Sequence, residues 1–455
     1  MKKKVLLSSI LTIALCACLI AGSTYALFTD SSSFDIEVTA GDVDITASLD
    51  DLKLWSVTPD DAGDVEDENG GLYRYEDQTA KDKFLNTGTA KFENNVLTIE
   101  RITPGDKVSF DITGANDSDV SILMRYVIKL APNTTEELAK GMVLTADGRN
   151  YTGVTSYTSV WVPVAVNDDM VPVTVELGLP VYAGDEYQEK GVEYVVTVEA
   201  VQGNAAVSYD QPIVEVINAV SDAAELADAI ANPFLDTIVF DSAVNAEITD
   251  DIVNKTFWAN GNALTLTFKG TLDNVVIDGA VATAAGTSID VNDATGKISI
   301  ANSSFISAPG SHNGAAIDMG TNVELVVDNC IFAGNNAGDY AISNTGATSS
   351  IKITNSTFTG FKSWAILVNN TVYGDLIVDN CTFETPDGVL KTLLSGGTGV
   401  TGDFTFTNNT MIGCKGHDAN PDKLLVSGSG TNPVSCTGIK TVTGNTLDGQ
   451  AWTQQ

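Results

Sequence analysis

The second half of the chain repeats itself every 25 to 28 residues. Five passages align on an asparagine that is followed three residues later by phenylalanine, or by Met411 in the last copy: KISIANSSFIS, ELVVDNCIFAG, SIKITNSTFTG, DLIVDNCTFET and DFTFTNNTMIG. The aligned residues are Asn302, Asn329, Asn355, Asn380 and Asn408, and a degenerate sixth copy, IKTVTGNTLDG, ends the series. Self-similarity at such a period predicts a solenoid with one coil per repeat.

The residue pattern inside each copy is that of strands rather than helices. Ile351 and Ile353, which precede Asn355, alternate with polar residues as a half-buried strand requires. Coils of this length, stacked at the ~4.8 Å strand spacing, predict a right-handed parallel β-helix over residues 241–455. An asparagine at the same turn of every coil can donate to one neighbouring coil and accept from the other. We therefore expect a structural asparagine ladder that satisfies buried amides.

A short helix is expected just before the first coil, within a linker and cap spanning residues 213–240. In SDAAELADAIANPF, Asp222 is placed to cap the helix, with Glu225 three residues later and Pro233 after the end. The apolar face would comprise Ala223, Leu226, Ala227 and Ile230. An amphipathic helix at this point would cover the open end of the solenoid.

Residues 216–455 resemble the pectate-lyase-like β-helix superfamily, which includes polysaccharide-active enzymes and bacterial adhesins. The resemblance implies the fold more firmly than an activity. Lyases of this superfamily typically use an arginine or lysine base with bound Ca²⁺, and its hydrolases use clustered aspartates. This chain has no arginine after Arg149, although Lys297, Lys352 and Lys362 remain as candidate bases.

The carboxylates and histidines of the second half give no catalytic pattern. Asp290, Asp293, Asp318, Asp339 and Asp375 are scattered singly in the sequence, which favours surface solvation over paired acid and base. His312 and His417 lie in no zinc-binding arrangement. Trp258 and Trp364 are isolated, which favours core packing over a sugar platform. We predict no catalytic, metal or cofactor residue, with Ca²⁺ as the one ion that the acidic surface could attract.

Four cysteines follow the N-terminal apolar run. Cys330 and Cys381 occupy equivalent positions two coils apart, hence ~9.6 Å, which is too far for a disulfide and favours buried packing. Cys414 and Cys436 flank the irregular insertion before the last copy. They are a candidate disulfide, with two free thiols as the alternative.

The chain begins like an exported protein. Three lysines, the apolar run Val5 to Ala21 and the small-residue region GSTYA predict a secretory signal peptide, residues 1–26. An uncleaved membrane anchor is the alternative. The net charge is −35, or −38 once Lys2, Lys3 and Lys4 are removed. Such a surface repels nucleic acid and anionic lipid, so neither is an expected partner after cleavage.

Residues 27–212 are expected to form an all-β domain of a different kind. Segments such as VLTIERI, KVSFDITGAND, VSILMRYVIKL and EYVVTVEAVQ alternate apolar and polar residues between polar turns. Many such strands without long helices predict an antiparallel jelly-roll sandwich. The acidic segment 60–71 lacks the residue order of an EF-hand, which favours a solvated loop over a calcium site.

The order of motifs in this half resembles the TasA and camelysin family of exported matrix proteins. The motifs are the cleavage region GSTYALFTD, the strand-like Ala40-Gly41-Asp42-Val43-Asp44-Ile45, the turn Pro104-Gly105-Asp106 and the closing strand YVVTVEAVQ. The resemblance implies a jelly-roll subunit of extracellular fibres, exported by a Gram-positive bacterium. It also implies that the new N-terminal segment can complete the sheet of a neighbouring subunit.

The segment SFDIEVT has the pattern that strand donation needs. Phe34, Ile36 and Val38 alternate with polar residues, so one face could fill an apolar groove while the backbone pairs with a free edge. The alternative is an ordinary first strand of the same domain. Together the two halves predict a secreted structural or adhesive protein of the biofilm matrix. Its first half would either self-associate into fibres or anchor the chain, and its β-helix would present a surface to glycans or neighbouring cells. A β-helix polysaccharide lyase or hydrolase, tethered by the first half, is the competing hypothesis.

Overall fold

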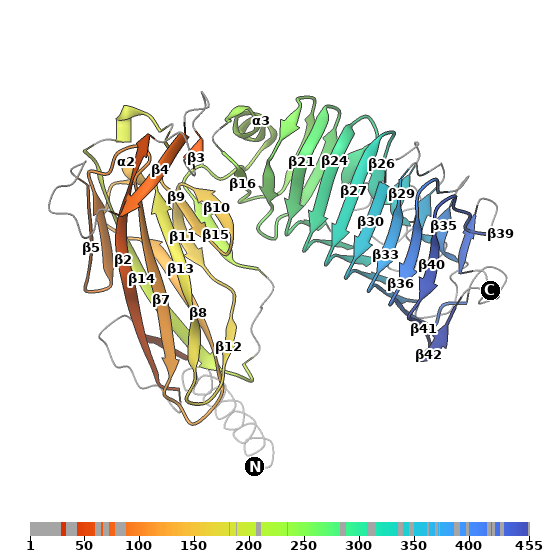
Figure 1. Cartoon of the computed structure of the whole chain (residues 1–455), viewed down its shortest axis with the longest axis horizontal. Coiled ribbons are helices and arrows are strands. Elements are labelled where there is room, and N and C mark those ends of the chain that lie inside the picture. The colour runs from red at the N-terminus through yellow and green to blue at the C-terminus, as the bar shows by residue number, and fades with distance from the viewer. Residues whose placement is uncertain are drawn as a thin grey trace, which may run out of the picture. The chain divides into compact units, whose positions relative to one another are not determined.

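The computed structural model describes residues 29–32, 43–59, 65–66, 72–77, 88–181, 183–187, 189–205, 211–233, 235–282, 288–306, 315–334, 340–344, 350–361, 364–368, 372, 374–385, 392–396, 400–415, 420, 424–427 and 432–453. The chain divides into two compact units, Met1–Asn218 and Ala219–Gln455, and both are built almost entirely of strands (Figure 1). No helix within these described ranges is long and apolar enough to cross a bilayer. The predicted signal segment lies outside them.

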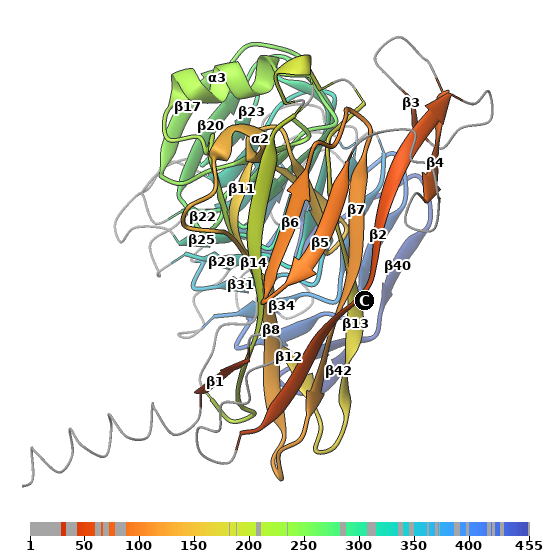
Figure 2. The ribbon, with the colours of Figure 1, turned by 90° about the vertical axis from the view of Figure 1, so that its left-hand side faces the viewer.

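The first sheet of the N-terminal unit has eight antiparallel strands. Its main path runs through β15 (Ile213–Val216), β11 (Val154–Thr158), β8 (Ile122–Leu130), β14 (Gly191–Gln202), β6 (Val96–Glu100) and β5 (Thr89–Glu93). Two further strands join it, since β1 (Thr29–Ser32) pairs with β14 and β12 (Val162–Val164) pairs with β8. Figure 2 shows β1 beside the lower part of β14.

The second sheet of this unit has seven antiparallel strands. Its order is β10 (Arg149–Thr152), β9 (Val143–Ala146), β13 (Asp169–Gly178), β7 (Lys107–Asn116), β2 (Ile45–Pro59), β4 (Leu72–Asp77) and β3 (Val65–Glu66). The two sheets meet through their apolar faces, and a Cβ atom placed on Gly114 of β7 would lie 3.0 Å from the Met124 sulfur of β8. Only the short helical turns α2 (Glu136–Ala139) and η1 (Asp185–Tyr187) interrupt the strands described here.

The Pro-Gly-Asp motif forms the turn that starts β7. Gly105 adopts φ +91°, and a Cβ atom there would lie 2.3 Å from Val57, so only glycine fits without displacing the neighbouring strand. The buried Asp106 carboxylate accepts a 2.7 Å hydrogen bond from the Thr103 amide, which closes the turn. The motif is therefore explained by backbone geometry.

The boundary between the units differs from the expected one at residue 212. β15 pairs with β11 through residues 213–216, so this segment belongs to the first sheet and not to a linker. The structure places the division between Asn218 and Ala219. The sequence prediction missed β15 because four residues carry too little alternation to identify a strand.

The C-terminal unit is the predicted parallel β-solenoid (Figure 1). Its ten-stranded sheet comprises β16 (Thr237–Val239), β19 (Thr256–Trp258), β21 (Thr271–Asp278), β24 (Thr295–Ala301), β27 (Val323–Asp328), β30 (Ser350–Thr354), β33 (Leu376–Asp379), β36 (Phe404–Thr407) and β40 (Lys440–Thr443), with β18 (Ile252–Val253) beside β21. The nine-stranded sheet comprises β17 (Val244–Ile248), β20 (Leu264–Phe268), β23 (Ile289–Val291), β26 (Ala315–Met319), β29 (Tyr340–Asn344), β32 (Trp364–Val368), β35 (Thr392–Gly396), β38 (Leu425–Ser427) and β39 (Asn432–Pro433). The eight-stranded sheet comprises β22 (Val281–Ala282), β25 (Ser304–Ile306), β28 (Ile331–Ala333), β31 (Thr357–Thr359), β34 (Thr382–Glu384), β37 (Thr410–Ile412), β41 (Asn445–Leu447) and β42 (Gln450–Trp452).

The repeated phenylalanines form a stack inside the solenoid. Phe305, Phe332, Phe358 and Phe383 are all buried, and their successive ring centroids lie 5.2, 4.9 and 4.8 Å apart, with the planes within 13° of parallel. These spacings match the strand repeat, so each coil stacks its ring on the ring of the previous coil. Trp258 is also buried, as expected for core packing.

Both ends of the solenoid depart from the parallel repeat. At the start, α3 (Ala223–Ala231) is capped by Asp222, which accepts hydrogen bonds from the Ala224 and Glu225 amides at 2.8 and 3.0 Å. The predicted apolar face is only half right: Leu226 and Ile230 are buried in the solenoid core, whereas Ala223 and Ala227 are exposed. At the far end, β39 and β42 run antiparallel to β38 and β41.

Candidate functional site

The N-terminal strand β1 occupies part of an edge that no other described strand fills. β6 pairs with β14 only as far as Val195, and the Asn95 carbonyl accepts a 3.0 Å hydrogen bond from the Val196 amide. Further along the same strand, β1 pairs with residues 198–201 of β14, with Ser31 opposite Glu199. The other side of β14 is paired with β8. The candidate donor residues Phe34, Ile36 and Val38 lie outside the described residues.

The five asparagines of the predicted ladder do connect neighbouring coils. Asn329 donates to Asn302 at 2.7 Å and Asn380 donates to Asn355 at 2.8 Å. The remaining amides donate to aspartates of the preceding coil: Asn302 to Asp278, Asn355 to Asp328 and Asn408 to Asp379. The expectation of buried amides is wrong, because Asn302 is half-exposed and the other four are exposed. All five have φ between +48° and +55°, so they lie at turns on the surface.

The buried ladder lies one residue further along the chain. Its members follow the aligned position in each coil: Ser303, Cys330, Ser356, Cys381, Asn409 and Asn445. The serine and asparagine members accept hydrogen bonds from backbone amides of the preceding coil, for example from Cys330 N to Ser356 Oγ at 3.1 Å and from Cys381 N to Asn409 Oδ1 at 2.8 Å. The two cysteine thiols donate to backbone carbonyls. The sequence signal was available, since every copy has a small or amide side chain after the aligned residue.

The four cysteines that the structure describes are free thiols, so the candidate disulfide between Cys414 and Cys436 is not formed. Cys414 follows β37 and its thiol contacts the Phe383 carbonyl at 3.5 Å inside the core. Cys436 lies at another corner of the coil, just before β40, where its backbone forms an isolated parallel β-bridge with Val400. Cys330 and Cys381 are buried as predicted, and burial raises the pKa of each thiol to about 12.

Two of the scattered aspartates come together on the solenoid. Asp290 of β23 and Asp318 of β26 are register partners on neighbouring parallel strands, so their Cα atoms are one strand spacing apart, ~4.8 Å. The interpretation of these residues as isolated is therefore wrong for this pair. Sequence could not show it, because the coil lengths that bring them into register depend on the loops between them.

The pair has an asymmetric environment. Desolvation, and next the Asp290 charge, raise the pKa of Asp318, while a 2.7 Å hydrogen bond from Asn292 opposes the shift. Asp290 accepts the Asn292 backbone amide at 3.0 Å. Nearby, Lys269 forms a 2.8 Å ion pair with Glu247. Within the described residues no group of three or more His, Cys, Asp or Glu side chains is arranged to hold a metal ion.

The other candidate residues of the second half that the structure describes are exposed or have separate partners, and Asp293 is a close neighbour of the pair in sequence. Asp293 is exposed, and Asp375 accepts a hydrogen bond from the Asp403 amide in a surface turn. Lys297 forms a 3.2 Å ion pair with Glu324. Lys352 is exposed on the ten-stranded sheet. His312, His417, Asp339, Lys362 and the side chain of Trp364 lie outside the described residues.

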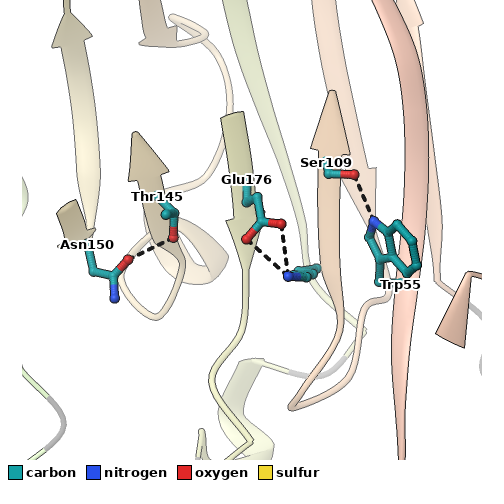
Figure 3. Close-up of polar contacts among 6 residues, drawn as sticks. Trp55, Ser109, Thr145, Asn150 and Glu176 are labelled. Atoms are coloured by element: carbon teal, nitrogen blue, oxygen red, sulfur yellow. Dashed lines mark hydrogen bonds and ion pairs between the residues drawn. The ribbon is translucent and has the colours of Figure 1, made fainter. Parts of the chain in front are cut away.

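A polar cleft of about 650 Å³ lies on the outer face of the seven-stranded sheet. Trp55 of β2 donates its indole N–H to Ser109 of β7 at 2.7 Å (Figure 3). Lys107 of β7 donates to both Glu176 oxygens at 2.8 and 3.0 Å. The Lys107 amine also lies 4.2 Å from the centre of the Tyr75 ring of β4. Desolvation, followed by the Glu176 charge, raises the pKa of Tyr75.

Sequence reasoning missed this cleft. Apart from the buried Phe110, its lining side chains are outward-facing residues of four strands that are far apart in the chain. The alternation of these strands was interpreted only as a sign of a buried inner face. An aromatic residue at an outward position, as Trp55 is within LKLWSV, was the one available signal.

Comparisons with known proteins leave the chain without an assigned family. No family model matches it, and no curated protein matches it. One solved structure to which it is similar is the catalytic unit of a thermostable GH87 α-1,3-glucanase from Streptomyces thermodiastaticus strain HF3-3. The identity is 12%, the match covers 94% of this chain and 99% of that one, and the TM-score is 0.23.

Proposed function

We propose that the chain is a secreted structural or adhesive protein of an extracellular matrix. In this proposal residues 1–26 direct export, and the N-terminal unit is a TasA-like jelly roll that assembles by donating its first strand. The solenoid, as a right-handed β-helix, presents a surface to glycans or neighbouring cells. The observation that carries the proposal is the pairing of β1 with the remaining edge of β14.

Strand exchange requires that the first strand occupy an edge that another copy can also fill. β1 contributes only four residues to β14, so the backbone hydrogen bonds it makes in its own unit can be made equally by the same strand of a second copy. The ten residues 33–42 link β1 to Val43 and can extend to about 35 Å. This reach allows β1 to leave its own sheet while the rest of the unit stays folded.

A cysteine clamp tests the exchange. The variant Ser31→Cys/Glu199→Cys, made with Cys436→Ser in a chain that starts at Leu27, places two thiols on opposed residues. If strands are exchanged, oxidation of the assembled protein gives a ladder of disulfide-linked oligomers on a non-reducing gel. Oxidation of the dilute monomer should instead give an intramolecular bond and block fibre formation until reductant is added. Electron microscopy follows the fibres.

The reduced double variant is the control for the loss of the Glu199 ion pair with Arg125, a 2.6 Å surface contact. It should assemble like the parent chain. Exclusively intramolecular disulfides under assembly conditions, or fibres that form with the clamp closed, would show that β1 is an ordinary strand of its own unit.

A second candidate function, hydrolysis of a polysaccharide, is favoured by the Asp290 and Asp318 pair. Retaining glycosidases hold two carboxyl groups about 5–5.5 Å apart, with one acid whose pKa is raised. The register places the two aspartates side by side on adjacent strands, and the pKa of Asp318 is raised, as the acid of such a pair requires. If this function is correct, the exported chain releases reducing sugar from a neutral polysaccharide, and Asp318→Asn and Asp290→Asn each abolish release. The matched control is Asp293→Asn at an exposed neighbouring position, which should release reducing sugar at the same rate as the parent chain.

A further inference from the structure

The cleft on the outer face of the seven-stranded sheet has the build of a preformed binding site. Its volume of about 650 Å³ lies within the ordinary range for ligand sites. Trp55, Tyr75, Lys107 and Glu176 are each half-buried, so every side chain presents part of its surface to the cleft. They stand on three strands that are adjacent in the sheet, β2, β7 and β13, and on the neighbouring β4.

Contacts among the cleft residues hold them before any ligand arrives. The indole of Trp55 is oriented by its hydrogen bond to Ser109 (Figure 3). Lys107 is held between Glu176 and the Tyr75 ring. On the rim, Thr174 donates to Asp111 at 2.6 Å. A ligand would therefore lose little affinity to side-chain ordering.

The charges of the cleft indicate an uncharged ligand. Both lysines are neutralised, Lys53 by Asp51 and Lys107 by Glu176, and Asp111 adds one further carboxylate. Among the lining residues that the structure describes, no free cation is left to bind an acidic ligand, while carboxylate oxygens remain as acceptors for hydroxyl groups. The net charge of −35 further disfavours polyanions.

The cleft lies on the face of a sheet and not at its edge. Added peptide strands bind through free backbone groups at edges, whereas β2, β7 and β13 are paired within the sheet along most of their length, apart from register shifts between Asp50 and Lys53 and between Met170 and Val173. Recognition here must use side chains: one aromatic plane and several hydrogen-bonding groups. An aromatic plane packs against the C–H face of a sugar ring, and carboxylates accept its hydroxyls.

We propose that this cleft of the N-terminal unit binds a neutral oligosaccharide, with Trp55 as the stacking platform and Glu176 and Asp111 as hydroxyl acceptors. The site is independent of the solenoid and of strand exchange. It would give the assembling unit its own glycan contact.

Calorimetric titration of the chain that starts at Leu27 tests the proposal. The probes are cellohexaose, laminarihexaose and chitohexaose, with hexagalacturonate as the anionic and hexalysine as the cationic control. We expect at least one neutral hexamer to bind with a millimolar or lower Kd, and Trp55→Ala to weaken it at least ~tenfold. Trp161→Ala is the matched control, because Trp161 is also half-buried but stacks 4.3 Å from Arg125 on the other sheet.

Thr174→Arg provides a second variant that leaves the core untouched, because Thr174 is exposed on the rim. It should fill the cleft and abolish binding while the circular dichroism spectrum and the melting temperature stay unchanged. The oxidised cysteine clamp should bind the sugar normally, which separates this site from assembly. The proposal fails if none of the neutral hexamers binds at millimolar concentration, or if Trp55→Ala and Thr174→Arg bind as the parent does. Tighter binding of hexagalacturonate or hexalysine would also overturn it.

Discussion

At the scale of single residues, backbone conformation explains the repeat better than side-chain bonding does. The aligned position has positive φ in every copy that carries asparagine, and Gly279 and Gly444 occupy it with φ of +69° and +71° in coils that lack one. Asparagine and glycine are the residues that adopt this left-handed conformation most readily. The turn therefore already favours asparagine at this position, and the hydrogen bonds between coils are an additional role of the same residue.

Two substitutions at Asn355 separate these roles. Asn355→Gly removes the hydrogen bonds to Asp328 and from Asn380 but keeps the turn, and it should lower the free energy of unfolding by about 1 kcal/mol. Asn355→Ala also forces an alanine into the left-handed region, so it should cost about 1 kcal/mol more. Urea unfolding measures both. An equal loss of unfolding free energy in the two variants would mean that only the hydrogen bonds of the ladder, and not the turn conformation, contribute to stability.

The sequence predicted the row of asparagines and its connection between coils, but not its exposure. The error arose because position in the coil was inferred from alternation alone. The residue after each asparagine faces inward, and its small side chain was not interpreted as a buried row. The same limit applies to Trp55, whose outward position depends on the long strand β2, which was not expected beyond Ile45.

At the scale of elements, the phenylalanine stack joins successive coils into one cooperative core. Phe358 lies between Phe332 and Phe383, with ring planes within 10° of parallel on both sides. Because each coil contacts only its neighbours, solenoid stability is a sum of coil and interface terms. Loss of one ring therefore weakens two interfaces at once.

Phe358→Ala should destabilise the C-terminal unit by about 3–5 kcal/mol, since it leaves a cavity in a fully buried stack. Thr357→Ala, on the same strand but facing outward, should change stability by less than about 0.5 kcal/mol. Thermal unfolding monitored by calorimetry should show the shift in one of two transitions. A small effect of Phe358→Ala would mean that the coils can close around the gap.

At the scale of the whole molecule, the sequence predicted two β units of different kinds, because a repeat occupies only one half. It placed their boundary too early and could not reveal the two candidate surfaces. The Asp290 and Asp318 pair depends on strand register, and the polar cleft depends on β2, β4, β7 and β13 becoming neighbours. Both are properties of topology, which local patterns do not specify.

The elements at the two ends of the solenoid limit the addition of further strands to its sheets. These elements are α3 at the start and the antiparallel strands β39 and β42 at the far end. A parallel sheet can lengthen indefinitely only while its last strand offers an edge of the same polarity, and here two of the three sheets finish with a reversed strand. The first coil is shielded by a helix. End-to-end growth of the C-terminal unit is therefore blocked in two of its three sheets, and we expect any filament of this protein to add its subunits through the other half.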